Sequence, residues 1–150
     1  MRTTLPRKRR RMADYYLQYS AVLMITAEET KWWEELLSLT PGERVLVEEI
    51  EKEEEELDME ASIVHEEGRS YVQFSAEENG NPGHVVLCVH KFLKQCRPEG
   101  EDEFVLTWAE TCSKMREGSF CGGTAVATKR GAGFCNTYDQ FNYARAEAKK

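Results

Sequence analysis

The chain has 150 residues, 41% of them hydrophobic and 10% aromatic, which is enough apolar material for one domain with a buried core and excludes a mainly disordered protein. It contains no run of about 18 apolar residues, so we expect no membrane association, and no apolar stretch follows its basic start to form a signal peptide. The net charge of −7 disfavours a nucleic-acid-binding body, and five cysteines, an odd number for a disulfide framework, indicate reduced thiols buried in a cytoplasmic protein.

Residues 1–11 carry six basic side chains and no acidic one. We expect them to form a disordered basic arm, through which alone the chain would contact nucleic acid, with a natural start at Met12 as an alternative. Residues 12–150 then hold 14 basic and 27 acidic side chains, a net charge of −13, and are expected to fold as a single domain.

The first expected element is a strand from Tyr15, because YYLQYSAVLMI alternates and places every second residue from Tyr15 to Leu23 on one face. A helix follows to about Ser38. Thr26 and Glu29 have the spacing of a capping box, in which each side chain accepts a hydrogen bond from the backbone of the other.

Pro41-Gly42 ends this helix, and the acidic segment 43–60 is expected to begin another one. We interpret its acidic run, Glu48–Glu60, as a solvated helix face. A docking surface for a basic partner and a mimic of the nucleic-acid backbone are the alternatives. The spacing of the carboxylates is not that of a calcium-binding loop.

Residues 57–65 and 70–76 alternate, and Glu66-Glu67-Gly68-Arg69 lies between them, so they predict a β-hairpin. Asn81 and Pro82 then predict the N-cap and first turn of a helix that ends near residues 98–100. Its apolar stripe runs from Val85 to Cys96 at helical spacing.

Alternating apolar residues from Phe104 to Trp108 predict a further strand, residues 113–121 a loop, and Thr124–Thr128 a short strand. Thr137 with Gln140 predicts the cap of a C-terminal helix. This order predicts an α+β fold that resembles the ferredoxin-like, split β-α-β sandwich: a four- to five-stranded, mainly antiparallel sheet with helices on one face. A different α+β arrangement is the alternative.

The densest group of reactive side chains lies between Phe104 and Val126. Two basic residues could attract an anion, paired glycines could let backbone N–H groups approach it, and an aromatic ring could stack on it. The alternative is an ordinary hairpin connection, in which the glycines permit a positive φ or a bulge. The residues expected to bind a ligand or partner are Trp108, Glu110, Lys114, Arg116, Phe120, Gly122 and Gly123.

Cys112 is the candidate nucleophile of an enzymatic interpretation, because Lys114 and Arg116 could stabilise its thiolate. Alternation along the strand places it beside Glu110 instead, whose charge would raise the thiol pKa, so a thiol that fills a gap is the favoured interpretation. Cys121 is the more exposed thiol. Glu110 is expected at the rim of the sheet or, if buried, paired with a basic residue of the loop.

No metal or cofactor is expected. The cysteines form no Cys-x-x-Cys pair, and neither of the glycine-rich nucleotide-binding motifs occurs. His65, His84 and His90 lack the spacing of a helical metal site, and we expect them at the surface or the rim.

Three segments together carry a resemblance: MADYYLQYSAVL, GNPGHVVLCVHKFL and FVLTWAETCSKMREGSFCGGTAV. The chain resembles a group of small uncharacterised proteins from bacteria and their phages. In that group the third segment is similar to W-A-x-T-C-S-K-P-R followed by F-G-G-G-A, and here Met115 stands in the place of the proline and Cys121 in that of the first glycine. The resemblance implies a domain that begins at Met12 and a bacterial or mobile-element setting, and it implies no activity.

The sequence therefore predicts a non-enzymatic, intracellular binding or regulatory protein, encoded by a phage or mobile element. It would act on a host protein through its acidic surface and the 108–123 loop. The alternative is a small enzyme or a domain that binds a small anionic, nucleotide-like ligand around Glu110, Cys112, Lys114 and Arg116. A homodimer formed by strand pairing at an exposed sheet edge is a further hypothesis.

Overall fold

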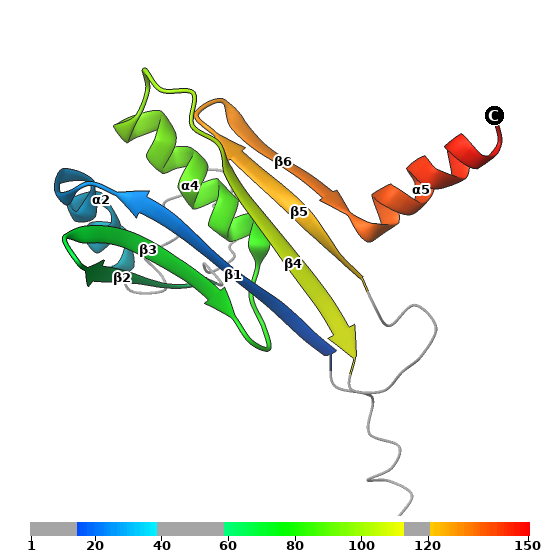
Figure 1. Ribbon diagram of the computed structural model, residues 1–150, viewed down its shortest axis with the longest axis horizontal. Coiled ribbons are helices and arrows are strands. Elements are labelled where there is room, and N and C mark those ends of the chain that lie inside the picture. The colour runs from blue at the N-terminus through cyan, green and yellow to red at the C-terminus, as the bar shows by residue number, and fades with distance from the viewer. Residues whose placement is uncertain (1–14, 39–58, 113–120) are drawn as a thin grey trace, which may run out of the picture.

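The computed structural model describes residues 15–38, 59–112 and 121–150 (Figure 1). The described strands are β1 (Tyr15–Ile25), β2 (Glu60–Glu66), β3 (Arg69–Ala76), β4 (Phe104–Cys112), β5 (Cys121–Thr128) and β6 (Gly131–Asn136). The described helices are α2 (Ala27–Ser38), α4 (Pro82–Cys96) and α5 (Thr137–Ala148). The basic arm, nearly all of the acidic segment 43–60 with its expected helix, and the loop 113–120 lie outside the described residues.

The fold is α+β, with one open, antiparallel sheet of six strands in the order β2-β3-β1-β4-β5-β6. The prediction of four or five strands was too low because it missed β6. Glycine has a low preference for strands and β6 contains two of them, so its sequence GAGFCN carries no alternating pattern. The strand nevertheless pairs with β5 along its whole length. The strand predicted at Thr124–Thr128 is also longer than expected and begins at Cys121.

β1 lies in the middle of the sheet, between β3 and β4, and its successive side chains point alternately to the two faces of the sheet. Tyr19 and Leu23 are buried on one face, as the sequence predicted. Val22 and Met24 lie on the other face and are half-exposed. Among the described residues, the sheet is therefore covered on one face, and we call the other face the open face.

Two helices cover the buried face. α2 contacts β2 and β3, and α4 contacts β4, β5 and β6. Aromatic rings join the layers, since Trp33 of α2 meets Phe74 of β3 at 5.5 Å between ring centroids and Phe92 of α4 at 5.4 Å. Fully burying side chains of this size contributes about 1.5–3 kcal/mol each, so this aromatic contact is a main source of stability.

The predicted caps of the first two helices are confirmed. The backbone N–H of Thr26 donates to Glu29 Oε1 at 2.9 Å, and the backbone N–H of Glu29 donates to Thr26 Oγ1 at 3.2 Å. At α4, Asn81 Oδ1 accepts a hydrogen bond from the backbone N–H of Gly83 at 2.9 Å, and Pro82 occupies the first turn. These side chains satisfy N–H groups that have no partner within their helix.

The predicted hairpin is confirmed as β2 and β3. Its turn consists of Glu67 with φ 48° and Gly68 with φ 75°. Two successive residues with positive φ give a two-residue turn whose twist matches that of the strands. The turn fixes the register, in which Ile63 lies opposite Val72 on the buried face.

α5 begins differently from the prediction. Its N-cap is Asn136, and the capping box joins Asn136 to Asp139, where the sequence had suggested Thr137 and Gln140. No side chain of α5 is buried. Figure 1 shows the helix leaving the end of β6 and pointing away from the sheet.

One histidine prediction was wrong, because His84 is buried in the first turn of α4. His65 is exposed and His90 is half-buried, with Nδ1 2.7 Å from the backbone carbonyl of Thr128. No helix in the described part of the chain is both long and apolar enough to cross a bilayer.

Candidate functional site

The structure describes only part of the predicted binding group. Trp108, Glu110, Gly122 and Gly123 lie on the paired strands β4 and β5, in a register that sets Trp108 opposite Gly123 and Glu110 opposite Cys121. Lys114, Arg116 and Phe120 lie outside the described residues. The described members of the predicted binding group are therefore all strand residues.

The two glycines serve the packing of the sheet. A Cβ atom on Gly123 would overlap the indole ring of Trp108, which lies across the strand, and one on Gly122 would overlap the carbonyl oxygen of Trp108. Neither glycine has a positive φ, so the predicted turn or bulge geometry is absent at these two positions. Glycine is required here because β5 must leave room for Trp108.

Glu110 lies half-buried near the end of β4, and its described partner is a thiol. Cys121 Sγ donates to Glu110 Oε2 at 3.1 Å. This hydrogen bond, with partial burial and the carboxylate charge, raises the pKa of Cys121 from 9.0 to about 11. A thiol held protonated is a poor nucleophile, so Cys121 does not have the properties of a catalytic cysteine.

The side chain of Cys112, which we expected beside Glu110, lies outside the described part of the structure, so that expectation stays a prediction. In the sheet, Cys112 pairs with Tyr15 of β1. Of the other described cysteines only Cys88 is buried, Cys96 is intermediate, and Cys121 and Cys135 are exposed. The expectation of a buried thiol was therefore wrong for Cys135 of β6, whereas the expectation that Cys121 is an exposed thiol is confirmed.

A shallow groove of about 450 Å³ lies on the open face beside the start of α5. One wall is Thr107, Ala109 and Thr111 of β4, and the other contains Thr137 and Gln140 of α5. Thr137 closes the end of the groove, since its hydroxyl accepts from the backbone N–H of Gly122 at 2.8 Å and donates to the Gly122 carbonyl at 3.0 Å. The surface of the groove is mainly apolar, with hydroxyl and amide groups from the threonines and Gln140 among the residues that line it.

An apolar patch lies further along the same face. Val22 and Met24 of β1 are each 48% exposed, and Val105 of β4 is 53% exposed. They line a second hollow of about 290 Å³, which is bounded by Arg97, Asp102 and Glu103. An alternating strand in a half-covered sheet normally presents polar residues to water, so three half-exposed apolar side chains distinguish this part of the open face. We call Val22, Met24 and Val105 the open-face patch.

The arginine at the edge of this patch is fully engaged. Arg97 Nε and Nη2 donate to the two carboxylate oxygens of Glu29 at 2.8 and 2.9 Å, Nη1 donates to Asp102 at 3.1 Å, and Nη2 also donates to the Met24 carbonyl at 2.7 Å. The hydrogen bonds from Arg97 hold the pKa of Glu29 below its usual value. These contacts make Arg97 a structural residue rather than a free ligand for an anion.

Sequence reasoning missed the open-face patch. The sequence YYLQYSAVLMI contained the signal, because its second half is apolar at every position rather than at every second one. Val22 and Met24 therefore make the face opposite the core apolar as well. The described residues contain no cluster of three or more His, Cys, Asp or Glu side chains suited to a metal ion.

Comparison with protein-family models, with curated proteins and with solved structures finds no significant match to this chain.

Proposed function

We propose that this chain is a non-enzymatic protein-binding or regulatory protein that binds its partner through the open face of the sheet. The observation that carries the proposal is the open-face patch: Val22 and Met24 of β1 and Val105 of β4 are about half-exposed and line the same hollow. Burying half-exposed side chains of this kind contributes about 1–2 kcal/mol each to an association.

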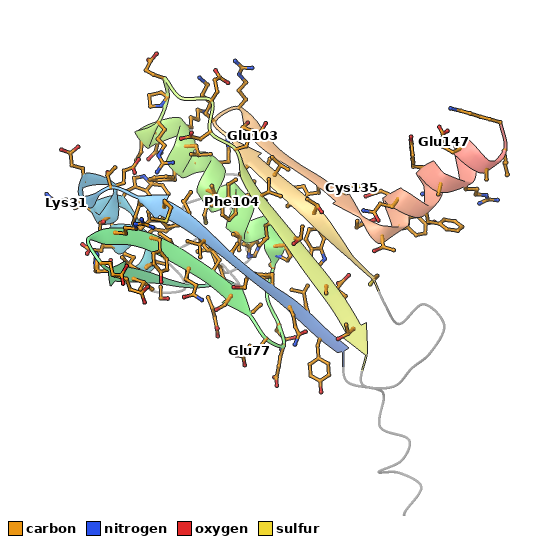
Figure 2. All side chains as sticks on the ribbon, viewed as in Figure 1. Lys31, Glu77, Glu103, Phe104, Cys135 and Glu147 are labelled. Carbon is orange, nitrogen blue, oxygen red and sulfur yellow. The ribbon has the colours of Figure 1, made fainter. Side chains whose placement is uncertain are left out.

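The charges around the patch indicate the chemistry of the partner. Glu101, Asp102 and Glu103 are exposed beside it, before the start of β4 (Figure 2). Glu101 is paired with Lys129 and Asp102 with Arg97, whereas the described residues show no ion pair for Glu103. An exposed carboxylate beside an apolar centre favours a partner with an apolar ridge and a neighbouring Lys or Arg. That the partner is a host protein in the cytoplasm, and that the chain comes from a phage or mobile element, are proposals supported by the sequence resemblance alone.

The alternative of a small enzyme or anion-binding domain has no separate support among the described residues. The pKa of the Cys121 thiol is raised to about 11, which removes its advantage as a nucleophile. Gly122 and Gly123 are held by packing against Trp108.

We also propose the ferredoxin-like arrangement for residues 15–112. The supporting features are the chain order β1-α2-β2-β3-α4-β4 and the sheet order β2-β3-β1-β4, in which the third strand lies between the first and second. β5 and β6 would then extend this unit at the β4 edge.

The functional proposal is tested by affinity capture from bacterial lysate followed by a binding measurement with the purified captured protein. The variants Val22→Lys and Val105→Lys place a charge in the open-face patch, and Lys94→Glu on the exposed side of α4 is the control. We expect the patch variants to weaken binding about five- to thirtyfold and the control to bind like wild type. Equal binding by all three folded variants would contradict the proposal.

A further inference from the structure

The outer edge of β6 is free of any other strand in the described part of the chain. Among the described strands, β6 is the last of the sheet and pairs with β5 alone. None of its six residues is charged and none is proline. The opposite edge strand, β2, has Glu60 and Glu66 at its ends and His65 within it. Because charged side chains and prolines are the usual protection of an exposed edge, β6 differs from β2 in being open to pairing.

The glycines of β6 are not required by the packing of the chain itself. A Cβ atom on Gly131 or Gly133 would meet nothing within 4 Å, in contrast to Gly122 and Gly123 of the neighbouring strand. Neither Gly131 nor Gly133 has a positive φ. Glycine within a strand often marks a place where another backbone approaches closely, and here no backbone of the described chain does so.

The helix that follows β6 is fixed at its base and bare along its length. Asn136 and Asp139 cap it, and Thr137 bonds both backbone groups of Gly122. Tyr138, Phe141 and Tyr143 are between 58% and 72% exposed. Figure 2 shows Cys135 at the junction of β6 and α5, and Glu147 far from the sheet. An isolated helix of this length has only marginal stability in water. A capped helix with exposed aromatic side chains therefore indicates a surface that becomes buried against another molecule.

Charge indicates what buries it. Residues 137–150 hold three basic and two acidic side chains, a net charge of +1. The other described residues, 15–38, 59–112 and 121–136, hold seven basic and 14 acidic side chains, a net charge of −7. The segment that contains α5 is thus complementary in sign to the rest of the domain, and a second copy of the chain offers that acidic surface together with an identical free edge.

We propose that two copies of this chain form a symmetric dimer in which β6 pairs antiparallel with β6 of the second copy and each α5 packs on the other copy. The two-fold axis is normal to the sheet, so residues opposite one another lie on the same face. On the open face only Gly131, Gly133 and Cys135 then meet across the axis, which permits close approach. On the helix-covered face Phe134, itself 53% exposed, meets Phe134 or Ala132 of the second copy.

The dimer would contain one continuous sheet of twelve strands, twice the six of one copy, with both open faces on the same side. The pairing is independent of the function proposed above, because it uses neither Val22, Met24 nor Val105. If both hold, one dimer presents two partner-binding patches side by side, and a partner with two copies of its own site is bound with increased avidity.

The test is sedimentation equilibrium of the purified full chain over a wide concentration range. Wild type is expected to sediment as a species of twice 17.3 kDa, or 34.6 kDa, at the higher concentrations. Gly133→Lys on β6 and Phe141→Lys on α5 are each expected to raise the dimer dissociation constant about tenfold. Ser62→Lys adds the same charge to the exposed surface of the opposite edge strand and is expected to leave the dimer unchanged.

Circular dichroism confirms that each variant is folded, and amide hydrogen exchange locates the interface. Amides of β6 are expected to gain protection as the protein concentration rises, and those of β2 are not. A monomeric wild type, a dimer unaffected by both Gly133→Lys and Phe141→Lys, or a dimer weakened equally by Ser62→Lys would overturn the proposal. Val22→Lys and Val105→Lys leave the dimer intact, so failure of the partner-binding proposal is recognised separately.

Discussion

Arg97 and Glu29 form an ion pair with two hydrogen bonds, at 2.8 and 2.9 Å, that joins the end of α4 to the first turn of α2. Glu29 also completes the capping box with Thr26. The guanidinium group lies 5.1 Å from the centre of the Phe92 ring, so the pair closes over the aromatic contact between the helices. Residues that are 68 positions apart in the chain thus hold the two covering helices together.

Replacing Arg97 should destabilise the domain. Arg97→Met keeps much of the side-chain volume but leaves the Glu29 carboxylate, which is only 11% exposed, without its cation. We expect the free energy of unfolding to fall by about 2–3 kcal/mol, measured by urea denaturation. Arg130→Met removes an exposed arginine and should change the free energy of unfolding by less than about 0.5 kcal/mol. Equal effects of the two substitutions would contradict a structural role for the pair.

The same pair predicts a pH dependence. Hydrogen bonding to Arg97 lowers the pKa of Glu29 from 4.5, so the unfolded chain binds the proton more tightly than the folded chain. The stabilisation is therefore present above pH 4.5 and is lost as the pH falls through the lowered pKa of the folded state. Glu29→Gln should show a smaller loss of stability between neutral pH and pH 3, measured by urea denaturation at each pH. An unchanged acid dependence in this variant would exclude Glu29 as its source.

Glycine at position 123 should be necessary for folding stability. Gly123→Ala places a methyl group against the Trp108 indole and should lower the free energy of unfolding by about 1–3 kcal/mol. Gly131→Ala is the matched control, because a Cβ atom there meets nothing within 4 Å, and its effect should stay within about 0.5 kcal/mol. A binding role for Gly123 without a packing role would instead leave the stability of Gly123→Ala unchanged.

The Cys121 thiol should react slowly for an exposed cysteine. With its pKa raised from 9.0 to about 11, its thiolate fraction at pH 8 is on the order of a hundredfold below that of an ordinary thiol. Glu110→Gln removes the carboxylate charge and should speed alkylation of Cys121 by iodoacetamide at least about tenfold, measured by peptide mass spectrometry. Cys135, which is also exposed, serves as the internal reference in both proteins. Similar labelling rates at Cys121 before and after the substitution would show that Glu110 does not control the thiol.

Removing the caps of α4 and α5 should have different consequences. Asn81→Ala and Asn136→Ala each delete a side chain that accepts from the first turn of a helix, a loss of about 1 kcal/mol. α4 carries much of the core, so Asn81→Ala should lower the global free energy of unfolding. α5 buries no side chain, so Asn136→Ala should appear as faster amide exchange in α5, with little global change in a dilute sample. A global loss from Asn136→Ala in dilute solution would show that α5 supports the monomer.

Local signals in the sequence predicted the elements that have strong local chemistry. The capping pair Thr26 and Glu29, the Asn81-Pro82 start and the Glu67-Gly68 turn each specify a backbone conformation within a few residues, and the structure confirms them. β6 was missed because its conformation depends on pairing with β5 rather than on its own glycine-rich sequence. The cap of α5 was misplaced by one residue because Thr137 has a competing partner in Gly122, 15 positions away.

The candidate site was harder to predict for the same physical reason. That Gly122 and Gly123 face Trp108, and that Cys121 meets Glu110, follows from the register of β4 and β5. Alternation within each strand is compatible with more than one such register, so the strand sequences alone do not specify it. Exposure of Val22, Met24 and Val105 depends in turn on which sheet face the helices cover, and this is a property of the whole topology.

Because helices cover one face of the sheet, substitutions at alternate residues of a single strand affect either folding or the exposed surface. On β1, substitution of Tyr19 or Leu23 acts on folding, whereas substitution of Val22 or Met24, one position away, acts on a surface that contributes little to folding. Such a protein can change what it binds by accumulating substitutions at every second residue without spending the few kcal/mol of stability that a small domain has. The open face is for this reason the region in which related sequences are expected to diverge fastest, and comparing the two alternating sets of positions would test whether a partner constrains it.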